Sequence, residues 1–142
     1  MEKGLEPVKA KASLKAGTGT VNVDAGGYRV VVRSELEDNG PSPLALLASA
    51  LASCEALMFE MIAGSLGVEF DSLNVEVEMS FEVGYGLRWA RITYNVEGCT
   101  KEEAERVARL VARLCPVYRT MERSGARIIE DVRVSVKTQP SN

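Results

Sequence analysis

The sequence predicts an α+β protein with the element order β-β-β-α-β-β-α-β. Two blocks of the chain alternate apolar and polar residues, as half-buried strands do. Residues 44–66 are apolar on almost every face, which is typical of a buried helix, and a helix-capping pattern opens a second helix after residue 100. The length suits a single domain over residues 1–142, of which we expect 138–142 to be a disordered tail.

The N-terminal part predicts a three-stranded antiparallel meander. Residues 8–14 alternate apolar and polar side chains, Val21 and Val23 lie in a second strand, and residues 28–33 alternate again. The glycine-containing segments between these strands, at residues 16–19 and 25–27, are typical of turns. The first of them lacks the full dinucleotide-binding fingerprint and a following helix, so we interpret it as a hairpin turn.

A long apolar helix follows. Ser42 is suited to the N-cap and Pro43 to the first helical position, and Gly67 is a plausible stop after residue 66. Such a helix is roughly 35 Å long at 1.5 Å per residue. Because it is apolar on nearly all sides, it should be buried on all sides, which one small subunit can hardly achieve. The sequence therefore predicts a homodimer that encloses this helix.

The C-terminal part predicts a hairpin, a helix and a last strand. Residues 73–83 and 87–97 alternate strongly, and Trp89 falls out of phase, which predicts a β-bulge or a second buried face. Thr100 and Glu103 form a capping box at the start of an amphipathic helix.

Pro116 should end this second helix at Cys115, after which a short helix restarts through Val117 and Met121. Residues 131–136 alternate again and predict the final strand.

Composition limits the possible functions. Hydrophobic residues make up 46% of the chain, enough for a core, and the net charge of −3 argues against a nucleic-acid partner. The N-terminus has no apolar signal-peptide region, and we expect a soluble, cytoplasmic protein without a membrane partner. The chain has no histidine, which removes Ser-His-Asp and Cys-His catalysis and the commonest zinc ligand. We therefore expect neither a metal nor a cofactor.

The three cysteines are Cys54, Cys99 and Cys115, and an odd number makes a poor disulfide framework. The pattern around Cys54 alone favours a buried cysteine that packs as a small hydrophobic residue. Cys115 precedes Pro116, so it either caps the short helix or merely ends the apolar face before it. In the capping position the helix N-terminus would lower the pKa of its thiol, and Arg119 would add positive charge.

Cys99 lies in the turn before the capping box, and we expect it to be exposed and incidental. The sequence has no Cys-x-x-Cys pair, which leaves a thioredoxin-like motif and a zinc ribbon without support.

Three segments in the right order resemble one known family. Residues 40–54 read GPSPLALLASALASC and closely resemble the first-cysteine helix of the OsmC/Ohr family. Residues 115–120 read CPVYRT and resemble its second-cysteine segment, and residues 15–23 are similar to its N-terminal hairpin. The resemblance spans nearly the whole chain. It implies an intertwined dimer in which long helices pack back to back, enclosed by two sheets, with active sites at the dimer interface.

The resemblance also implies a function. The best-studied relatives are thiol peroxidases that reduce organic hydroperoxides at the expense of a dithiol reductant. By position, Cys54 would be the peroxidatic cysteine, Cys115 the resolving cysteine, and Arg33 the arginine that holds the thiolate. We therefore expect a Cys54 sulfenate that condenses with Cys115 to a disulfide.

One position departs from the family. Its peroxidases carry a glutamate that holds the arginine at the start of the cysteine helix, where this sequence has Leu44 and Ala45. Glu35, Glu37 and Asp38 in the preceding loop are the candidates to replace it. Two alternatives therefore stay open on the same scaffold: a non-peroxidase protein that binds an apolar small molecule, and a dithiol redox sensor without turnover.

Overall fold

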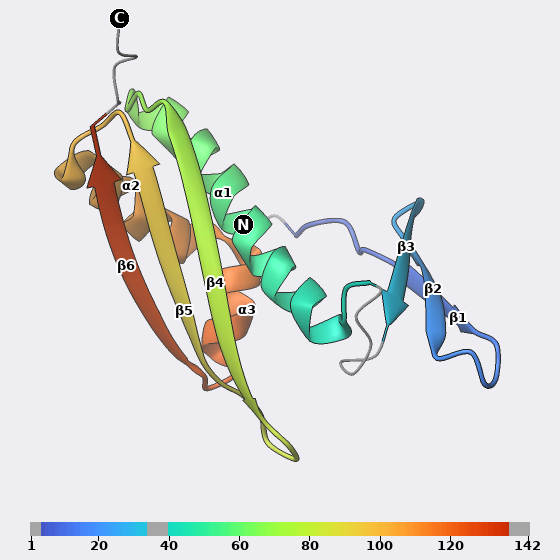
Figure 1. Cartoon of the computed structure of the whole chain (residues 1–142). Coiled ribbons are helices and arrows are strands. Elements are labelled where there is room, and N and C mark those ends of the chain that lie inside the picture. The colour runs from blue at the N-terminus through green and yellow to red at the C-terminus, as the bar shows by residue number, and fades with distance from the viewer. Residues whose placement is uncertain (1–3, 34–39, 137–142) are drawn as a thin grey trace, which may run out of the picture. The chain divides into compact units, whose positions relative to one another are not determined.

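The computed structural model describes residues 4–33 and 40–136, and it divides into two compact units, Met1–Leu47 and Ala48–Asn142 (Figure 1). The expected tail at 138–142 lies outside the described residues. The observed element order is three strands, a long helix, two strands, two helices and a last strand. This is the predicted α+β arrangement, with the short helix after residue 116 present as its own element.

The first unit contains the predicted meander. Strands β1 (Ala10–Leu14), β2 (Thr20–Ala25) and β3 (Tyr28–Arg33) form an antiparallel sheet in the order β1-β2-β3. The turn between β2 and β3 consists of Gly26 and Gly27, whose φ angles are 61° and 94°. Positive φ at both central residues is the hairpin geometry that matches strand twist, and it is a conformation that glycine adopts without strain.

The long helix α1 (Pro43–Leu66) begins and ends where the sequence predicts. The Ser42 hydroxyl oxygen accepts a hydrogen bond from the Ala45 amide at 3.1 Å, and Gly67 ends the helix with a φ of 71°. By length and composition alone α1 could cross a membrane, and the core helix of a soluble protein passes the same test.

Burial of α1 differs from one side to the other. Within the single chain its buried residues follow one stripe, namely Leu51, Glu55, Phe59, Ile62 and Ala63. On another side Leu57 is 69% exposed and Met61 is 58% exposed. One chain therefore covers only part of a helix that is apolar on nearly every face.

The second unit is built on a sheet of β4 (Ser72–Glu82), β5 (Gly86–Glu97) and β6 (Arg127–Ser135). β4 and β5 are antiparallel, whereas β5 and β6 are parallel. The predicted bulge is confirmed, because Ser80 pairs with Trp89 and the register then shifts so that Phe81 pairs with Leu87.

The last strand begins at Arg127, four residues before the predicted start at 131. The adjacent pair Ile128 and Ile129 breaks the alternation that the prediction relied on, and both side chains are half-buried.

Helices α2 (Lys101–Leu114) and α3 (Pro116–Arg123) connect β5 to β6, and all three helices lie on one face of the sheet (Figure 1). The predicted capping box of Thr100 and Glu103 is present at the start of α2. The core lies between this helical layer and the sheet, where the ring centroids of Phe59 and Tyr94 are 5.9 Å apart. The covered face of the sheet and its helices contribute the buried residues Ala90, Ile92, Tyr94, Val96, Ala104, Val107, Ala108 and Val111.

Candidate active site

Cys115 occupies the joint between α2 and α3. Its φ of −70° and ψ of 118° are extended, as expected for a residue that precedes a proline. Its amide donates to the Val111 carbonyl at 2.8 Å, which closes α2, and its sulfur accepts a long hydrogen bond of 3.5 Å from the Tyr118 amide, which opens α3. The cysteine therefore caps the short helix, as one of the two sequence interpretations proposed.

The fold brings Cys115 and Cys54 together. The Cys115 thiol donates toward the Cys54 sulfur with the two Sγ atoms 2.9 Å apart, although the residues are 61 positions apart in the sequence. Both are free thiols; Cys115 is fully buried, and Cys54 on α1 is partly exposed. A reagent from solution therefore meets Cys54 before Cys115.

The expected lowering of the Cys115 pKa is wrong. Burial raises the pKa of this thiol to about 12, and the hydrogen bond to Cys54 and the nearby Glu55 charge act in the same direction. The Tyr118 amide at the helix N-terminus opposes the rise, as capping predicts, but it does not outweigh desolvation. At neutral pH Cys115 is consequently a neutral thiol and a hydrogen-bond donor.

Glu55 is a buried acid that the sequence reasoning did not single out. It follows Cys54 on α1 and is fully buried. The Tyr94 hydroxyl donates to its Oε2. Its Oε1 has no hydrogen-bond partner of ordinary length among the residues that the structure describes.

Several groups set the ionisation of Glu55. Burial raises its pKa above the ordinary value, hydrogen bonding from Tyr94 and from the Cys115 thiol opposes this, and the Glu130 charge adds to the rise. A signal was available in the sequence, because position 55 falls at helical spacing between Leu51 and Phe59, on the stripe that packs against the sheet.

A second carboxylate and a second tyrosine, Glu130 and Tyr118, lie near Glu55. Tyr118 is buried on α3 and hydrogen-bonds to Glu130 of β6, which pairs with Ile92 in the sheet. Burial and the Glu130 charge raise the Tyr118 pKa, and burial raises the pKa of Glu130. Both tyrosines of the site therefore remain protonated donors at neutral pH.

Arg33, the predicted thiolate partner, belongs to the first unit and ends β3. Its Nη1 donates to the Thr20 hydroxyl, and its Nε is buried without a hydrogen-bond partner within the described ranges. Gly40 packs closely against it, since a Cβ at this position would lie 2.9 Å from Arg33 Cγ. The role of Arg33 toward Cys54 stays a prediction.

Glu35, Glu37 and Asp38, the candidates to hold the arginine, lie outside the described residues.

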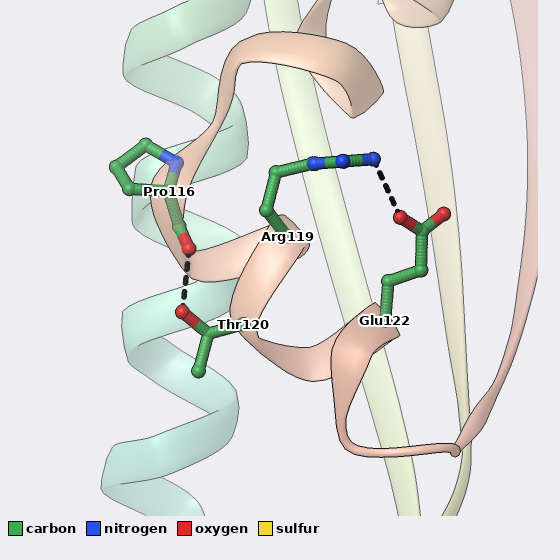
Figure 2. A network of polar contacts seen from close by, with 4 residues as sticks. All are labelled: Pro116, Arg119, Thr120 and Glu122. Atoms are coloured by element: carbon green, nitrogen blue, oxygen red, sulfur yellow. Dashed lines mark hydrogen bonds and ion pairs between the residues drawn. The ribbon is translucent and has the colours of Figure 1, made fainter. Parts of the chain in front are cut away.

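Arg119 does not supply the expected positive charge to Cys115. Figure 2 shows its side chain extending to Glu122, with Nη1 2.7 Å from Oε1, while Thr120 donates to the Pro116 carbonyl within the same helix. This ion pair is partly exposed, so it is screened by solvent.

Cys99 is half-exposed rather than exposed, and burial followed by the Glu103 charge raises its pKa. Among the residues with described positions, no group of three or more His, Cys, Asp or Glu could hold a metal ion.

The family model described as OsmC-like protein matches residues 36–131. The chain belongs to the OsmC-like family. A comparison with curated proteins gives no match.

Solved structures of OsmC-like proteins share the fold. The OsmC-like protein of Mycoplasma pneumoniae has a TM-score of 0.79 at 20% identity, covering 94% of this chain and 99% of that one. The organic hydroperoxide resistance protein OsmC of Legionella pneumophila has a TM-score of 0.72 at 19% identity, covering 96% and 100%. OhrB of Bacillus subtilis, an organic hydroperoxide resistance protein, has a TM-score of 0.64 at 17% identity, covering 94% and 100%. The predicted family and α+β fold class are thus confirmed.

Proposed function

We propose that this OsmC-like protein is a thiol-dependent peroxidase that reduces organic hydroperoxides through Cys54 and Cys115. The observation that carries the proposal is the 2.9 Å separation of the two sulfur atoms. Relatives of the same fold from Legionella pneumophila and Bacillus subtilis are described as organic hydroperoxide resistance proteins. Their names support the substrate class, and the sulfur pair supports the chemistry.

The different exposure of the two cysteines supports Cys54 as the peroxidatic and Cys115 as the resolving cysteine. Cys54 is partly exposed and accepts a hydrogen bond from the fully buried Cys115 thiol. The second thiol is therefore already in contact with the sulfur that would attack the peroxide. Cys54 attacks the peroxide, the O–O bond breaks, an alcohol leaves, and sulfenic acid remains on Cys54. Cys115 then displaces the hydroxyl group to form a disulfide, which an external dithiol reduces.

Two further parts of the proposal extend beyond the sulfur pair. Arg33 is the proposed cation for the Cys54 thiolate. Its Nε is buried and has no hydrogen-bond partner among the described residues, so this N–H is available to donate. A homodimer is proposed because Leu57 and Met61 expose apolar surface on α1. The free thiols suit a reducing compartment, and we propose the cytoplasm.

The test is consumption of cumene hydroperoxide in the presence of a dithiol reductant. Wild type should turn over repeatedly, and Cys54→Ser should lose roughly 1000-fold or more in rate, falling toward the uncatalysed reaction. Cys99→Ser is the matched control and should retain the wild-type rate, because the hydrogen bonds described for the Cys54 and Cys115 sulfur atoms do not involve Cys99. Cys115→Ser should still form one sulfenic acid per chain but no internal disulfide.

Two other outcomes would replace the proposal. Consumption of one equivalent of hydroperoxide, followed by a stable Cys54–Cys115 disulfide that the dithiol does not reduce, would indicate a redox sensor. No consumption by wild type, together with a copurified apolar molecule in native mass spectrometry, would indicate a binding protein.

A further inference from the structure

The second step of the proposed reaction poses a problem of proton transfer. Cys115 must lose its proton to attack the oxidised Cys54 sulfur, because the thiolate is the nucleophile. Its side chain is fully buried, which keeps bulk water away from the proton. Burial also raises its pKa to about 12, so the spontaneous thiolate fraction at neutral pH is very small. An internal proton acceptor would remove this obstacle.

Glu55 is the carboxylate in the right place. Among residues 4–33 and 40–136 it is the only carboxylate whose side chain is fully buried, and it is the chain neighbour of Cys54. Tyr94 holds one of its oxygens by a hydrogen bond, and the other has no partner of ordinary length there. The Cys115 thiol and this carboxyl group are close enough for each to shift the pKa of the other. A buried acceptor with an unused oxygen beside a buried thiol is suited to receive a proton.

We propose that Glu55 is the general base that deprotonates Cys115 when the Cys54–Cys115 disulfide forms. The inference rests on the proposed function for its sulfenic-acid substrate. In this step the Cys115 proton moves to Glu55, the S–S bond forms, and the S–O bond of the Cys54 sulfenic acid breaks. The departing hydroxide takes the proton back from Glu55 and leaves as water. The Cys115 sulfur is oxidised, the Cys54 sulfur is reduced, and Glu55 returns to its starting state.

The surroundings of Glu55 determine the pH dependence of this step. Tyr94 on β5 and the Cys115 thiol stabilise the carboxylate, whereas burial and Glu130 on β6 favour the protonated acid and raise its pKa. Tyr118 of α3 holds Glu130 by a hydrogen bond. Only the ionised carboxylate accepts a proton, so the step slows as pH falls through the raised pKa of Glu55. Above that pKa the rate levels off, whereas without a base it would keep rising toward the pH at which Cys115 itself ionises.

The test uses an aromatic disulfide that releases a coloured thiol, in a Cys99→Ser background. Cys54 attacks the reagent and releases one equivalent, and Cys115 then attacks the mixed disulfide and releases a second. The second phase is assigned by its loss in Cys115→Ser. Glu55→Gln should leave the first phase within about threefold and slow the second roughly 100-fold, the usual contribution of a general base. In this variant the rate of the second phase should also no longer fall as the pH is lowered through the pKa of Glu55.

Glu76→Gln is the matched control, because Glu76 is exposed on β4. It should keep both phases at wild-type rates. A second phase in Glu55→Gln with the wild-type rate and pH profile would overturn the inference. If Glu55→Gln does not fold, the pH profile of the Cys99→Ser protein itself serves as the test. If the rate of its second phase rises tenfold per pH unit up to about pH 10 without a plateau, Glu55 is excluded as the base. No hydroperoxide is used, so a failed peroxidase assay leaves this result independent.

Discussion

Burial of Glu55 ties the stability of the protein to pH. Burial raises the pKa of its carboxyl above the ordinary value of 4.5, so the folded state binds this proton more tightly than the unfolded state. The contribution of Glu55 to stability is therefore most favourable below about pH 4.5, and it is lost as pH rises through the folded-state pKa. Above that pH the folded protein carries a buried charge, which Tyr94 and Cys115 stabilise in part.

Glu55→Gln removes this titration while it keeps the shape of the side chain. The free energy of unfolding is measured in urea from pH 5 to pH 8. As pH rises, the value for the variant should increase relative to the value for wild type. The change is at most about 1.4 kcal/mol per pH unit between the two pKa values. Glu76→Gln, at an exposed position of β4, is the matched control for replacing a glutamate by glutamine. If the free energy of unfolding of Glu55→Gln differs from that of wild type by the same amount at every pH, burial does not raise the pKa of Glu55.

At the scale of secondary structure, Pro116 sets the position of the Cys115 sulfur. A residue before proline avoids the helical region, so Cys115 stays extended and ends α2 while it caps α3. Without the proline ring, α2 could continue through position 115, which would turn the sulfur away from Cys54. The break between the two helices is thus part of the thiol site.

Pro116→Ala should slow closure of the Cys54–Cys115 disulfide several-fold in the two-phase thiol assay. The matched control is Pro43→Ala, which removes a proline from the first position of α1. Both variants should lose about 0.4–1 kcal/mol of stability through the greater freedom of the unfolded chain. Equal disulfide rates in the two variants would show that the helix break does not position the sulfur.

Secondary structure was predictable where one local pattern decides it. Ser42 and Gly67 bound α1, Thr100 opens α2 and Trp89 marks the bulge, since caps and phase breaks act over a few residues. The start of β6 was missed because Ile128 and Ile129 do not alternate. Its parallel pairing with β5 depends on the path of the chain through α2 and α3, which no local pattern records.

In the candidate site, too, features set by neighbouring residues could be predicted, and features set by contacts between distant segments could not. The capping role of Cys115 could be inferred from Pro116, but the sign of its pKa shift could not, because that depends on how deeply the joint is buried. Glu55 was overlooked since its value lies in contacts with Tyr94 and Cys115, which come from distant parts of the chain. The cysteine pairing came from family resemblance rather than from periodicity.

For the molecule as a whole, one side of α1 leaves apolar side chains exposed. Leu57 and Met61 are apolar side chains one helical turn apart, and both are more than half exposed. Exposed apolar surface on a helix of this length favours association with a second copy. The proposed homodimer would bury these side chains.

Replacement of both Leu57 and Met61 by Glu should shift the protein from dimer to monomer in analytical ultracentrifugation. Loss of both apolar side chains from each of the two subunits costs at least about 4 kcal/mol, which weakens the dimer roughly 1000-fold or more. Val83→Glu is the control, because Val83 is a fully exposed apolar residue in the turn after β4. A double variant that sediments like wild type would rule out this face as the interface, and circular dichroism distinguishes dissociation from unfolding.

The crossover between β5 and β6 has a consequence for the newly made chain on the ribosome. Cys115 lies in that crossover, and Cys54 lies on a helix made 61 residues earlier. Local structure alone cannot bring the sulfurs together, since they meet only through packing of non-local segments, which is a slow part of folding. A nascent chain therefore carries separate, ordinary thiols, and the paired, oxidisable dithiol arises only with the finished fold.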